Sequence, residues 1–450
     1  MRKPHLTENY KIHNILLLII LLSTPLIILK ILGVSLIFFF SIIFGWVTPI
    51  ILYFITGYNL LLLVIGYFKK LFKPTNLDEA DYNKLPTLSI IIPVKNEEHV
   101  VGRLLKRITE LNYPKEKLEV IIVEDGSTDN TKAICEEYAQ KHDYIKVYTR
   151  DRSVGKPDAI EFGCQKANGE IIGVFDADSL PEKDLLIKAV NRLNNPGTAA
   201  VQGRLKALNI SQTPLAEISD YEMRLNQLIA AGRNDLNLFV QLYGTNQFIK
   251  RSILQEVGSW NIHALAEDQE ISIRLYKKGY YIKIFDGETY QENPANIRQF
   301  LKQRLRWYTG GFQNLRQHFN APKNIKVGNK LVKFDIALYL LNPFFTIMGT
   351  LCLLFGIPLI FLQAPLIYTL ELVLYAFIAL NICLFAWAGL LAVKTRNPRK
   401  LLLAPYLYIY WFLIFLATSW ALIKTYACRR LEWVKTDKTG AVTERKFLES

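Results

Sequence analysis

Two long apolar stretches, one at each end, limit most strongly what this chain of 450 residues can fold into. Between Lys11 and Lys69 the only charged side chain is Lys30. About 20 helical residues cross the hydrocarbon core of a bilayer, so this stretch predicts two spans, at 12–32 and 36–67. Because the apolar region is too long and no cleavage-like break follows it, a secretory signal peptide is not expected.

The other end repeats this pattern. Apolar runs at 340–362, 366–393 and 401–423 predict three further spans. Buried helices of a soluble protein are the alternative, but soluble cores rarely contain such long uncharged runs. The predicted organisation is an N-terminal membrane region (1–74), a polar domain (75–332), a C-terminal membrane region (333–424) and a basic tail (425–450).

Basic residues beside the spans predict the orientation, since cytoplasmic flanks carry more Lys and Arg. They precede the first span and follow the second, which places the polar domain in the cytoplasm of an integral protein of the cell or plasma membrane. The residues are Arg2, Lys3, Lys11, Lys69, Lys70 and Lys73. Three C-terminal spans would put the tail outside, yet Lys424, Arg429, Arg430 and Lys435 favour the inside. One apolar run would then lie along the interface or re-enter.

The net charge of +14 does not indicate nucleic-acid binding, because the basic residues gather where anionic lipid headgroups lie. The five cysteines are scattered without a CxxC pair, which argues against a zinc site and against a disulfide framework. The lipid bilayer is therefore the expected partner, and nucleic acid is not.

The polar domain alternates short apolar runs with helical patterns. Strands are predicted at 88–93, 118–123, 146–148 and 170–175, and helices at 98–111, 129–142 (capped by Asp129) and 158–168. This alternation is typical of an α/β domain with a parallel sheet, in which ligands bind beyond the carboxyl ends of the strands.

Acidic residues stand at those strand ends. Asp176 and Asp178, separated by one alanine, suit a hard divalent cation. The alternative without a metal is a solvated turn. Glu124 and Asp125 end the second strand, where they read either as a turn or as acceptors for a base or ribose.

Two later motifs also allow two readings. Glu267 and Asp268 open a helix; they either favour its dipole or provide a general base. In the run 303–307, an arginine suits a diphosphate and a tryptophan suits a sugar face, although an interfacial helix would have the same composition. Tyr308 to Gly311 reads as a mobile loop.

The order of these motifs, together with the flanking spans, resembles the membrane-integrated family 2 glycosyltransferases. These include cellulose, hyaluronan, chitin and poly-N-acetylglucosamine synthases. The resemblance covers about 88–315, and four motifs in order are far more specific than any one. It implies an α/β GT-A nucleotide-diphospho-sugar transferase domain in the cytoplasm, inserted between N- and C-terminal transmembrane helices.

The resemblance also implies roles for matching residues. The nucleotide sugar would be held by Pro93, Asn96, Glu97, Glu124, Asp125, Lys156, Asp176 and Gln202, and the metal, Mg²⁺ or Mn²⁺, by Asp176 and Asp178. The acceptor would meet Gly244, Thr245, Gln303 and Trp307, while Asp268, Glu267 and Arg306 would be catalytic. Ala266 replaces a threonine common in the family and Glu124 replaces the usual aspartate, which leaves the subfamily open.

The expected function is inverting transfer of N-acetylglucosamine or glucose from a UDP-sugar to a growing β-linked polysaccharide, by a processive enzyme. A single-step transferase that makes a membrane glycolipid is the alternative, so the acceptor is a polysaccharide or a lipid. A nucleotide-regulated transporter is the third class; it is disfavoured because the apolar runs contain only two charged residues, Lys30 and Glu371. An accessory subunit is left open.

Overall fold

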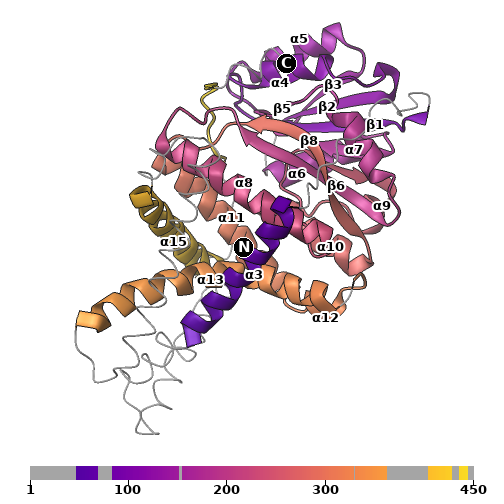
Figure 1. Cartoon of the computed structure of the whole chain (residues 1–450). Helices are drawn as coiled ribbons and strands as arrows, with labels where there is room; N and C mark the ends of the chain where they lie inside the picture. The colour runs from indigo at the N-terminus through magenta and orange to yellow at the C-terminus, as the bar shows by residue number, and fades with distance from the viewer. Residues whose placement is uncertain are drawn as a thin grey trace, which may run out of the picture. The chain divides into compact units, whose positions relative to one another are not determined.

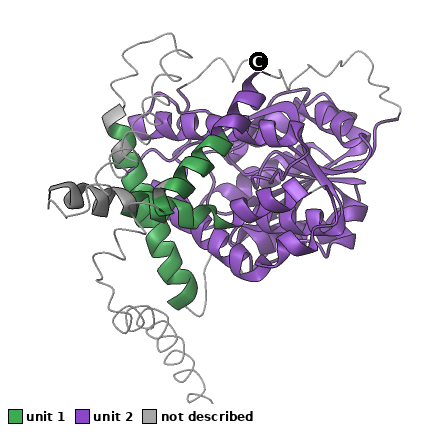
Figure 2. Ribbon diagram, turned by 60° about the horizontal axis from the view of Figure 1, so that its bottom comes forward, with its two compact units in different colours: residues 1–59, 341–431 green, residues 60–340, 432–450 purple. Residues whose placement is uncertain are grey.

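The computed structural model describes residues 47–68, 84–151, 155–328, 330–361, 404–427 and 435–443. These residues fall into two compact units (Figure 2). One unit comprises 1–59 and 341–431, and the other comprises 60–340 and 432–450. The polar domain and the end of the C-terminal tail therefore belong to the same unit.

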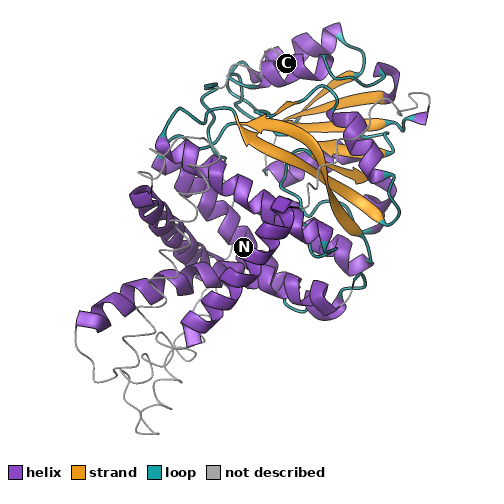
Figure 3. Ribbon diagram, viewed as in Figure 1, coloured by secondary structure: helices purple, strands orange, loops and turns teal. Residues whose placement is uncertain are grey.

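A single sheet of eight strands organises this second unit (Figures 1 and 3). Its order is β3-β2-β1-β4-β7-β6-β8-β5. The strands are β1 (Leu88–Val94), β2 (Leu118–Glu124), β3 (Ile145–Thr149), β4 (Ile171–Val174), β5 (Leu180–Pro181), β6 (Thr198–Ala207), β7 (Gln247–Lys250) and β8 (Tyr281–Gln291).

The first four strands confirm the sequence prediction, and they pair in parallel. In the remainder of the sheet the expectation of a parallel sheet is only partly confirmed: β6 and β8 also pair in parallel, but the other pairs do not. β7 runs antiparallel to both β4 and β6, and β5 runs antiparallel to β8. β7 has only four residues, so its apolar run was too short to mark a strand or its direction in the sequence.

Helices cover both faces of the sheet. They are α4 (Val101–Thr109), α5 (Thr131–Lys141), α6 (Lys156–Lys166), α7 (Leu185–Leu193), α8 (Pro214–Asp235), α9 (Arg251–Glu256), α10 (Glu267–Lys278), α11 (Ile297–His318), α12 (Ala321–Asn324) and the short 3-10 helix η4 (Lys115–Lys117). Ile90 and Ile92 join the main core with α4 and α7. Ile91 faces the other way, against Gly163 of α6, because side chains alternate along a strand.

The predicted cap of α5 is wrong. Asn130 occupies the N-cap position without a side-chain hydrogen bond. Asp129 precedes it; one carboxylate oxygen accepts the Thr131 amide at 3.0 Å and the other accepts the Glu98 amide at 3.2 Å. Asp129 therefore ties the loop after β1 to the start of α5.

Three described helices are long and apolar enough to cross a membrane, by length and composition: 50–68, 330–351 and 409–427. They lie within α3 (Thr48–Phe68), α13 (Lys330–Phe361) and α15 (Ala404–Ala427). α13 begins ten residues before the predicted span at 340. The spans predicted at 12–32 and 366–393 lie outside the described residues.

The strand order changes direction at β1. From β1 the chain passes outward to β2 and β3, then returns to place β4 on the opposite side of β1. Such a switch point leaves a crevice at the carboxyl ends of the strands. The loops that follow β1, β2 and β4 begin there, and they carry Asn96, Asp125 and Asp176.

Candidate active site

The loops after β1 and β2 are fastened to each other by short polar contacts. Asn96 has a left-handed backbone (φ 51°), which allows its side-chain oxygen to accept the Thr128 amide at 2.8 Å. Its own amide donates to the Ser127 hydroxyl at 3.0 Å. Next to it, the Glu97 amide donates to the Thr131 hydroxyl at 2.7 Å. The predicted nucleotide residues of β1 and β2 thus lie at one edge of the sheet.

Asp125 is held by an arginine that the sequence analysis missed. Arg150 donates from Nε to Asp125 Oδ1 at 2.8 Å, and it pairs with Asp158 at 2.5 Å. Asp125 and Glu124 are both buried. Arg150 follows β3, so its place at a strand end was the signal that could have revealed it.

Lys156 joins the two acidic motifs. Its ammonium lies 2.6 Å from Asp176 Oδ1 and 3.5 Å from Glu267 Oε1, and it donates to the Gly244 carbonyl at 2.9 Å. Burial opposes its charge, but the neighbouring carboxylates raise its pKa, so Lys156 remains an ammonium. The residue predicted to hold the nucleotide therefore contacts Asp176, Glu267 and the loop at 244.

Asp268 stands at the N-terminal turn of α10, beside this cluster. Burial raises its pKa to about 7, and the charge of Glu267 adds to the rise. Gly244 passes close above it: a Cβ at this position would lie 3.3 Å from Asp268 Oδ2 and 3.2 Å from Lys156 Nζ. With φ at 79°, the position favours glycine both by backbone and by space.

Thr245 and Gln202 shape the loop around Gly244. The Thr245 hydroxyl accepts the Asp176 amide at 3.1 Å and contacts the Ser179 hydroxyl at 2.9 Å. Gln202 is fully buried, and its amide group bonds four backbone groups between 203 and 246. Its side chain thus holds this loop, and the predicted contact with the donor sugar stays a prediction.

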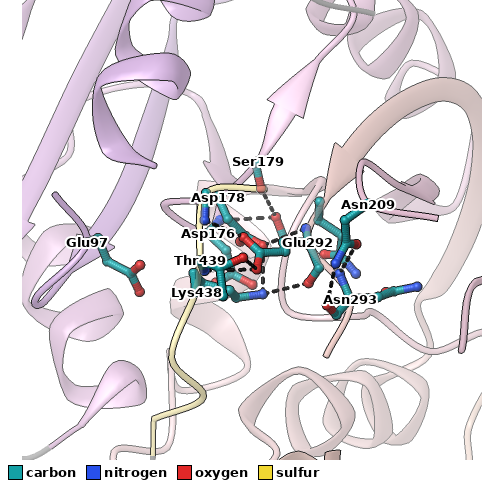
Figure 4. A network of polar contacts seen from close by, with 12 residues as sticks. Glu97, Asp176, Asp178, Ser179, Asn209, Glu292, Asn293, Lys438 and Thr439 are labelled. Atoms are coloured by element: carbon teal, nitrogen blue, oxygen red, sulfur yellow. Dashed lines mark hydrogen bonds and ion pairs between the residues drawn. The ribbon is translucent and has the colours of Figure 1, made fainter. Parts of the chain in front are cut away.

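The second aspartate of the pair contacts the C-terminal tail (Figure 4). Asp178 Oδ2 accepts the Glu292 amide at 2.9 Å and lies 2.7 Å from the Lys438 ammonium. The Glu292 carboxylate accepts the amides of Thr439 at 2.8 Å and Gly440 at 2.9 Å. Segment 435–443, more than 140 residues away in sequence, therefore lies beside the predicted metal ligands.

The charge of Lys438 stabilises the buried Asp178 carboxylate. Burial opposes ionisation of Asp178, but the Lys438 ammonium outweighs it, so the pKa of Asp178 is lowered. Glu97 is different: burial raises its pKa to about 7, although Lys435 lies 3.0 Å away and opposes the rise. The contact between Lys435 and Glu97 was not predicted from the sequence, in which Lys435 indicated only the orientation of the tail. The lysines of the tail were the signal that could have revealed its contacts with acidic site residues.

The run 303–307 lies in the first half of α11. The predicted loop at 308–311 is wrong, because α11 continues without interruption to His318. Gly310 allows the helix to approach α10: a Cβ there would lie 2.6 Å from the Ala266 Cβ. The Arg306 charge acts on both Lys156 and Asp268, which places the arginine beside the catalytic candidates.

Among the described residues, no three His, Cys, Asp or Glu side chains gather as a metal-binding group. Asp176 and Asp178 nevertheless offer two carboxyl groups from one short loop, the oxygen type that Mg²⁺ and Mn²⁺ accept. In this structure the two carboxylates face Lys156 and Lys438 respectively. The pair fits a cation that takes its remaining ligands from water and a diphosphate.

Residues 89–258 match the family model described as Glycosyl transferase family 2. The chain contains a family 2 glycosyltransferase domain. This segment of the chain includes the strands β1 to β4 and the Asp176–Asp178 pair, whereas Asp268 and α11 lie beyond it.

Curated proteins that are similar to this chain carry three kinds of name. The probable glycosyltransferase YdaM of Bacillus subtilis is 35% identical over 274 residues, 60% of this chain and 65% of YdaM. A beta-monoglucosyldiacylglycerol synthase of Nostoc sp. is 29% identical over 276 residues, 60% of this chain and 59% of the synthase. A poly-beta-1,6-N-acetyl-D-glucosamine synthase of Staphylococcus epidermidis is 28% identical over 284 residues, 60% of this chain and 66% of that synthase. The chain thus spans about two thirds or less of the relatives' length.

A solved structure is similar in fold. The mannosyltransferase PcManGT from Pyrobaculum calidifontis, in complex with GDP-Man and Mn²⁺, superposes with a TM-score of 0.56 and 21% identity. The superposition covers 84% of this chain and 98% of PcManGT. The chain therefore has a GT-A-like α/β fold, as its resemblance to the family implies.

Proposed function

We propose that this protein is a membrane-bound inverting hexosyltransferase. It transfers N-acetylglucosamine or glucose from a UDP-sugar to a growing β-linked polysaccharide, with its catalytic domain in the cytoplasm. The observation that carries the proposal is the Lys156 link, which brings Asp176 and the Glu267–Asp268 pair into one partly buried cluster. The beta-1,6-linked product named for the Staphylococcus epidermidis synthase supports the polysaccharide assignment.

Asp268 is the general base of this reaction. Its pKa of about 7 leaves it ionised in part near neutral pH while keeping it basic enough to take a proton. It removes the proton of the acceptor hydroxyl, whose oxygen attacks the anomeric carbon. The bond from that carbon to the diphosphate breaks on the opposite face, which inverts the configuration.

The charge on the departing diphosphate is balanced by groups on the other side of the cluster. A Mg²⁺ or Mn²⁺ held by Asp176 and Asp178 would supply positive charge to the diphosphate. Arg306 and Lys156 add fixed positive charge, and their partial burial strengthens its effect. Asn96, Glu97, Glu124 and Asp125 line the sheet edge assigned to the uridine.

A glycolipid product is the second candidate. The beta-monoglucosyldiacylglycerol synthases among the relatives are as similar to this chain as the polysaccharide synthase is. In that case the same cluster would act once on each lipid acceptor. The length of the product separates the two assignments.

The test is turnover by the purified full chain in detergent, with Mn²⁺ and each of UDP-N-acetylglucosamine, UDP-glucose and GDP-mannose. We expect release of UDP from one UDP-sugar and its near abolition in Asp268→Asn. The matched control is Asp143→Asn, an exposed aspartate between α5 and β3 that should leave the rate unchanged. A ladder of products identifies a polymer, whereas one glycolipid identifies the second candidate. Full activity of Asp268→Asn would refute the assigned base.

A further inference from the structure

The Arg304 guanidinium lies between two aromatic rings of its own helix, α11. Its Cζ is 4.6 Å from the centroid of the Trp307 ring and 4.9 Å from that of Phe300. Phe300 is fully buried, whereas Trp307 is 38% exposed. The guanidinium therefore supports an indole that keeps a substantial part of its surface accessible.

A carboxylate from another helix fixes this guanidinium. Glu222 of α8 pairs with Arg304 through both oxygens: Oε2 contacts the NH2 nitrogen, and Oε1 lies 3.4 Å from the NH1 nitrogen. The two side chains are only 7% and 13% exposed. A guanidinium that pairs with both oxygens of a carboxylate is held in the plane of that carboxylate, and burial limits the other conformations of the Arg304 side chain.

Trp307 directly precedes the part of α11 that packs on the segment before Glu267 and Asp268. Trp307 stands three residues before Gly310, so the two positions share a face of the helix. Gly310 touches Ala266, the residue directly before Glu267 and Asp268. One turn further, Gln313 accepts the Leu265 amide at 3.0 Å and donates to the His263 carbonyl at 2.8 Å. The second half of α11, which begins just after Trp307, is thus docked on the segment that leads to the base.

We propose that Glu222 and Arg304 are positioning residues for the acceptor sugar: they hold the Trp307 indole as a flat platform beside Asp268. The inference rests on the proposed function and deepens it. A pyranose ring has an apolar face that packs on an aromatic ring, so a platform at this place selects a sugar as acceptor. Neither Glu222 nor Arg304 touches the reacting atoms in this assignment.

Arg304→Lys is the decisive variant. A lysine can still pair with Glu222 and keep α8 tied to α11, but it lacks the planar group that stacks on both rings. With chitotriose as the acceptor probe, we expect Arg304→Lys to raise the acceptor KM about tenfold, the size of a lost cation–π contact. The donor KM and kcat should stay near those of the unchanged protein. An unchanged acceptor KM, or equal losses in donor KM and kcat, would overturn the proposal.

A double-mutant cycle tests whether Arg304 acts through Trp307. In a Trp307→Ala background, Arg304→Lys should add little, because the ring that it positions is gone. Full additivity of the two changes would contradict the proposal. Arg298→Lys, at an exposed position of the same helix, is the matched control and should leave every constant unchanged. The proposal would also be overturned if the protein uses dioleoylglycerol as its acceptor and Arg304→Lys leaves the KM for this lipid unchanged.

A spectroscopic measurement separates this inference from the proposed function. In protein labelled with fluorotryptophan, Trp307→Phe identifies the Trp307 fluorine resonance. We expect Arg304→Lys and Glu222→Gln to shift or broaden this resonance, and Arg298→Lys to leave it in place. If no sugar nucleotide turns over, the proposed function fails while the resonance still reports the support of the indole. A resonance that neither variant alters would refute the positioning role.

Discussion

Asp268 combines two environments that act on its pKa in the same direction. It is removed from water, and the carboxylate of Glu267 stands beside it, so both effects raise its pKa to about 7. The Lys156 ammonium opposes them but does not prevail. A carboxylate at an ordinary surface site would be a much weaker base.

This raised pKa predicts the pH dependence of catalysis. Below about pH 7, kcat/KM for the donor should fall about tenfold per pH unit, because the protonated carboxyl cannot take a proton. Glu267→Gln removes the neighbouring negative charge, lowers the pKa of Asp268 and should move this limb to lower pH. Glu256→Gln, an exposed control, should leave the profile in place. A profile that is flat from about pH 5 to about pH 8 would contradict the assignment.

The same shift predicts a cost in stability. The pKa of Asp268 in the folded protein lies above its ordinary value of 3.8, so the folded state holds this proton more tightly than the unfolded chain does. Binding of this proton stabilises the folded state in full when the pH is below the ordinary pKa of 3.8, and this stabilisation is lost as the pH rises through about 7. Asp268→Asn should therefore raise the thermal midpoint more at about pH 8 than at about pH 5. Equal shifts at both pH values, as expected for the control Asp143→Asn, would argue against a buried ionised carboxylate.

At the scale of elements, one glutamate just after β8 makes several of the contacts that hold the tail. The Glu292 carboxylate accepts the amides of both Thr439 and Gly440, while its own amide donates to Asp178. Lys438 also donates to the Glu292 carbonyl at 2.9 Å. Glu292 therefore connects the predicted metal ligand with segment 435–443.

Glu292→Gln should loosen this segment. The substituted amide can accept through only one oxygen, so at least one of the two backbone hydrogen bonds is lost. We expect faster deuterium uptake in the peptide that contains 435–443, measured by hydrogen exchange and mass spectrometry. Peptides of β1 and β2 serve as the internal control. Unchanged uptake in the tail peptide would contradict the role of Glu292.

Close packing between α3 and α8 depends on two glycines. A Cβ at Gly66 would lie 2.1 Å from the Leu228 carbonyl oxygen, and one at Gly232 would lie 2.0 Å from the Leu62 carbonyl oxygen. Each helix thus presents a glycine to the backbone of the other. The approach leaves no room for a side chain at either position.

Gly66→Ala should consequently destabilise the protein by about 1–3 kcal/mol, the usual cost of overpacking. Gly57→Ala on the same helix is the matched control, because no atom lies within 4 Å of its added Cβ and alanine favours a helix. Thermal unfolding in detergent measures both variants. Equal shifts of the thermal midpoint by Gly66→Ala and Gly57→Ala would contradict close packing at Gly66.

At the scale of the whole molecule, the basic flanks of the spans predict a cytoplasmic catalytic domain. Lys132 on α5 is 48% exposed, so a cysteine there should react readily with maleimide. In a background without the five native cysteines, Lys132→Cys should resist an impermeant maleimide in intact cells and react after permeabilisation. Labelling of intact cells would place the domain outside. Lysed cells provide the control for reactivity.

Much of the fold could be predicted from the local pattern of apolar and polar residues. The runs at β1 to β4 are short, apolar and bounded by turn residues, so periodicity and length marked them as strands before their partners were known. β7 was not accessible in this way, because its direction depends on pairing with β4 and β6 rather than on its own four residues. The uninterrupted path of α11 through Gly310 and Gly311 depends on its contact with Ala266.

The sequence by itself determined the chemistry that is available: apolar ends, acidic residues after strands, and an arginine–tryptophan motif in a fixed order. Only the tertiary structure decided which of these groups meet. Lys156 reaches both Asp176 and Glu267, Arg150 takes Asp125, and Lys438 takes Asp178. The physical reason is that residue types and local periodicity are written along the chain, whereas burial and charge pairing arise between segments that lie far apart in it.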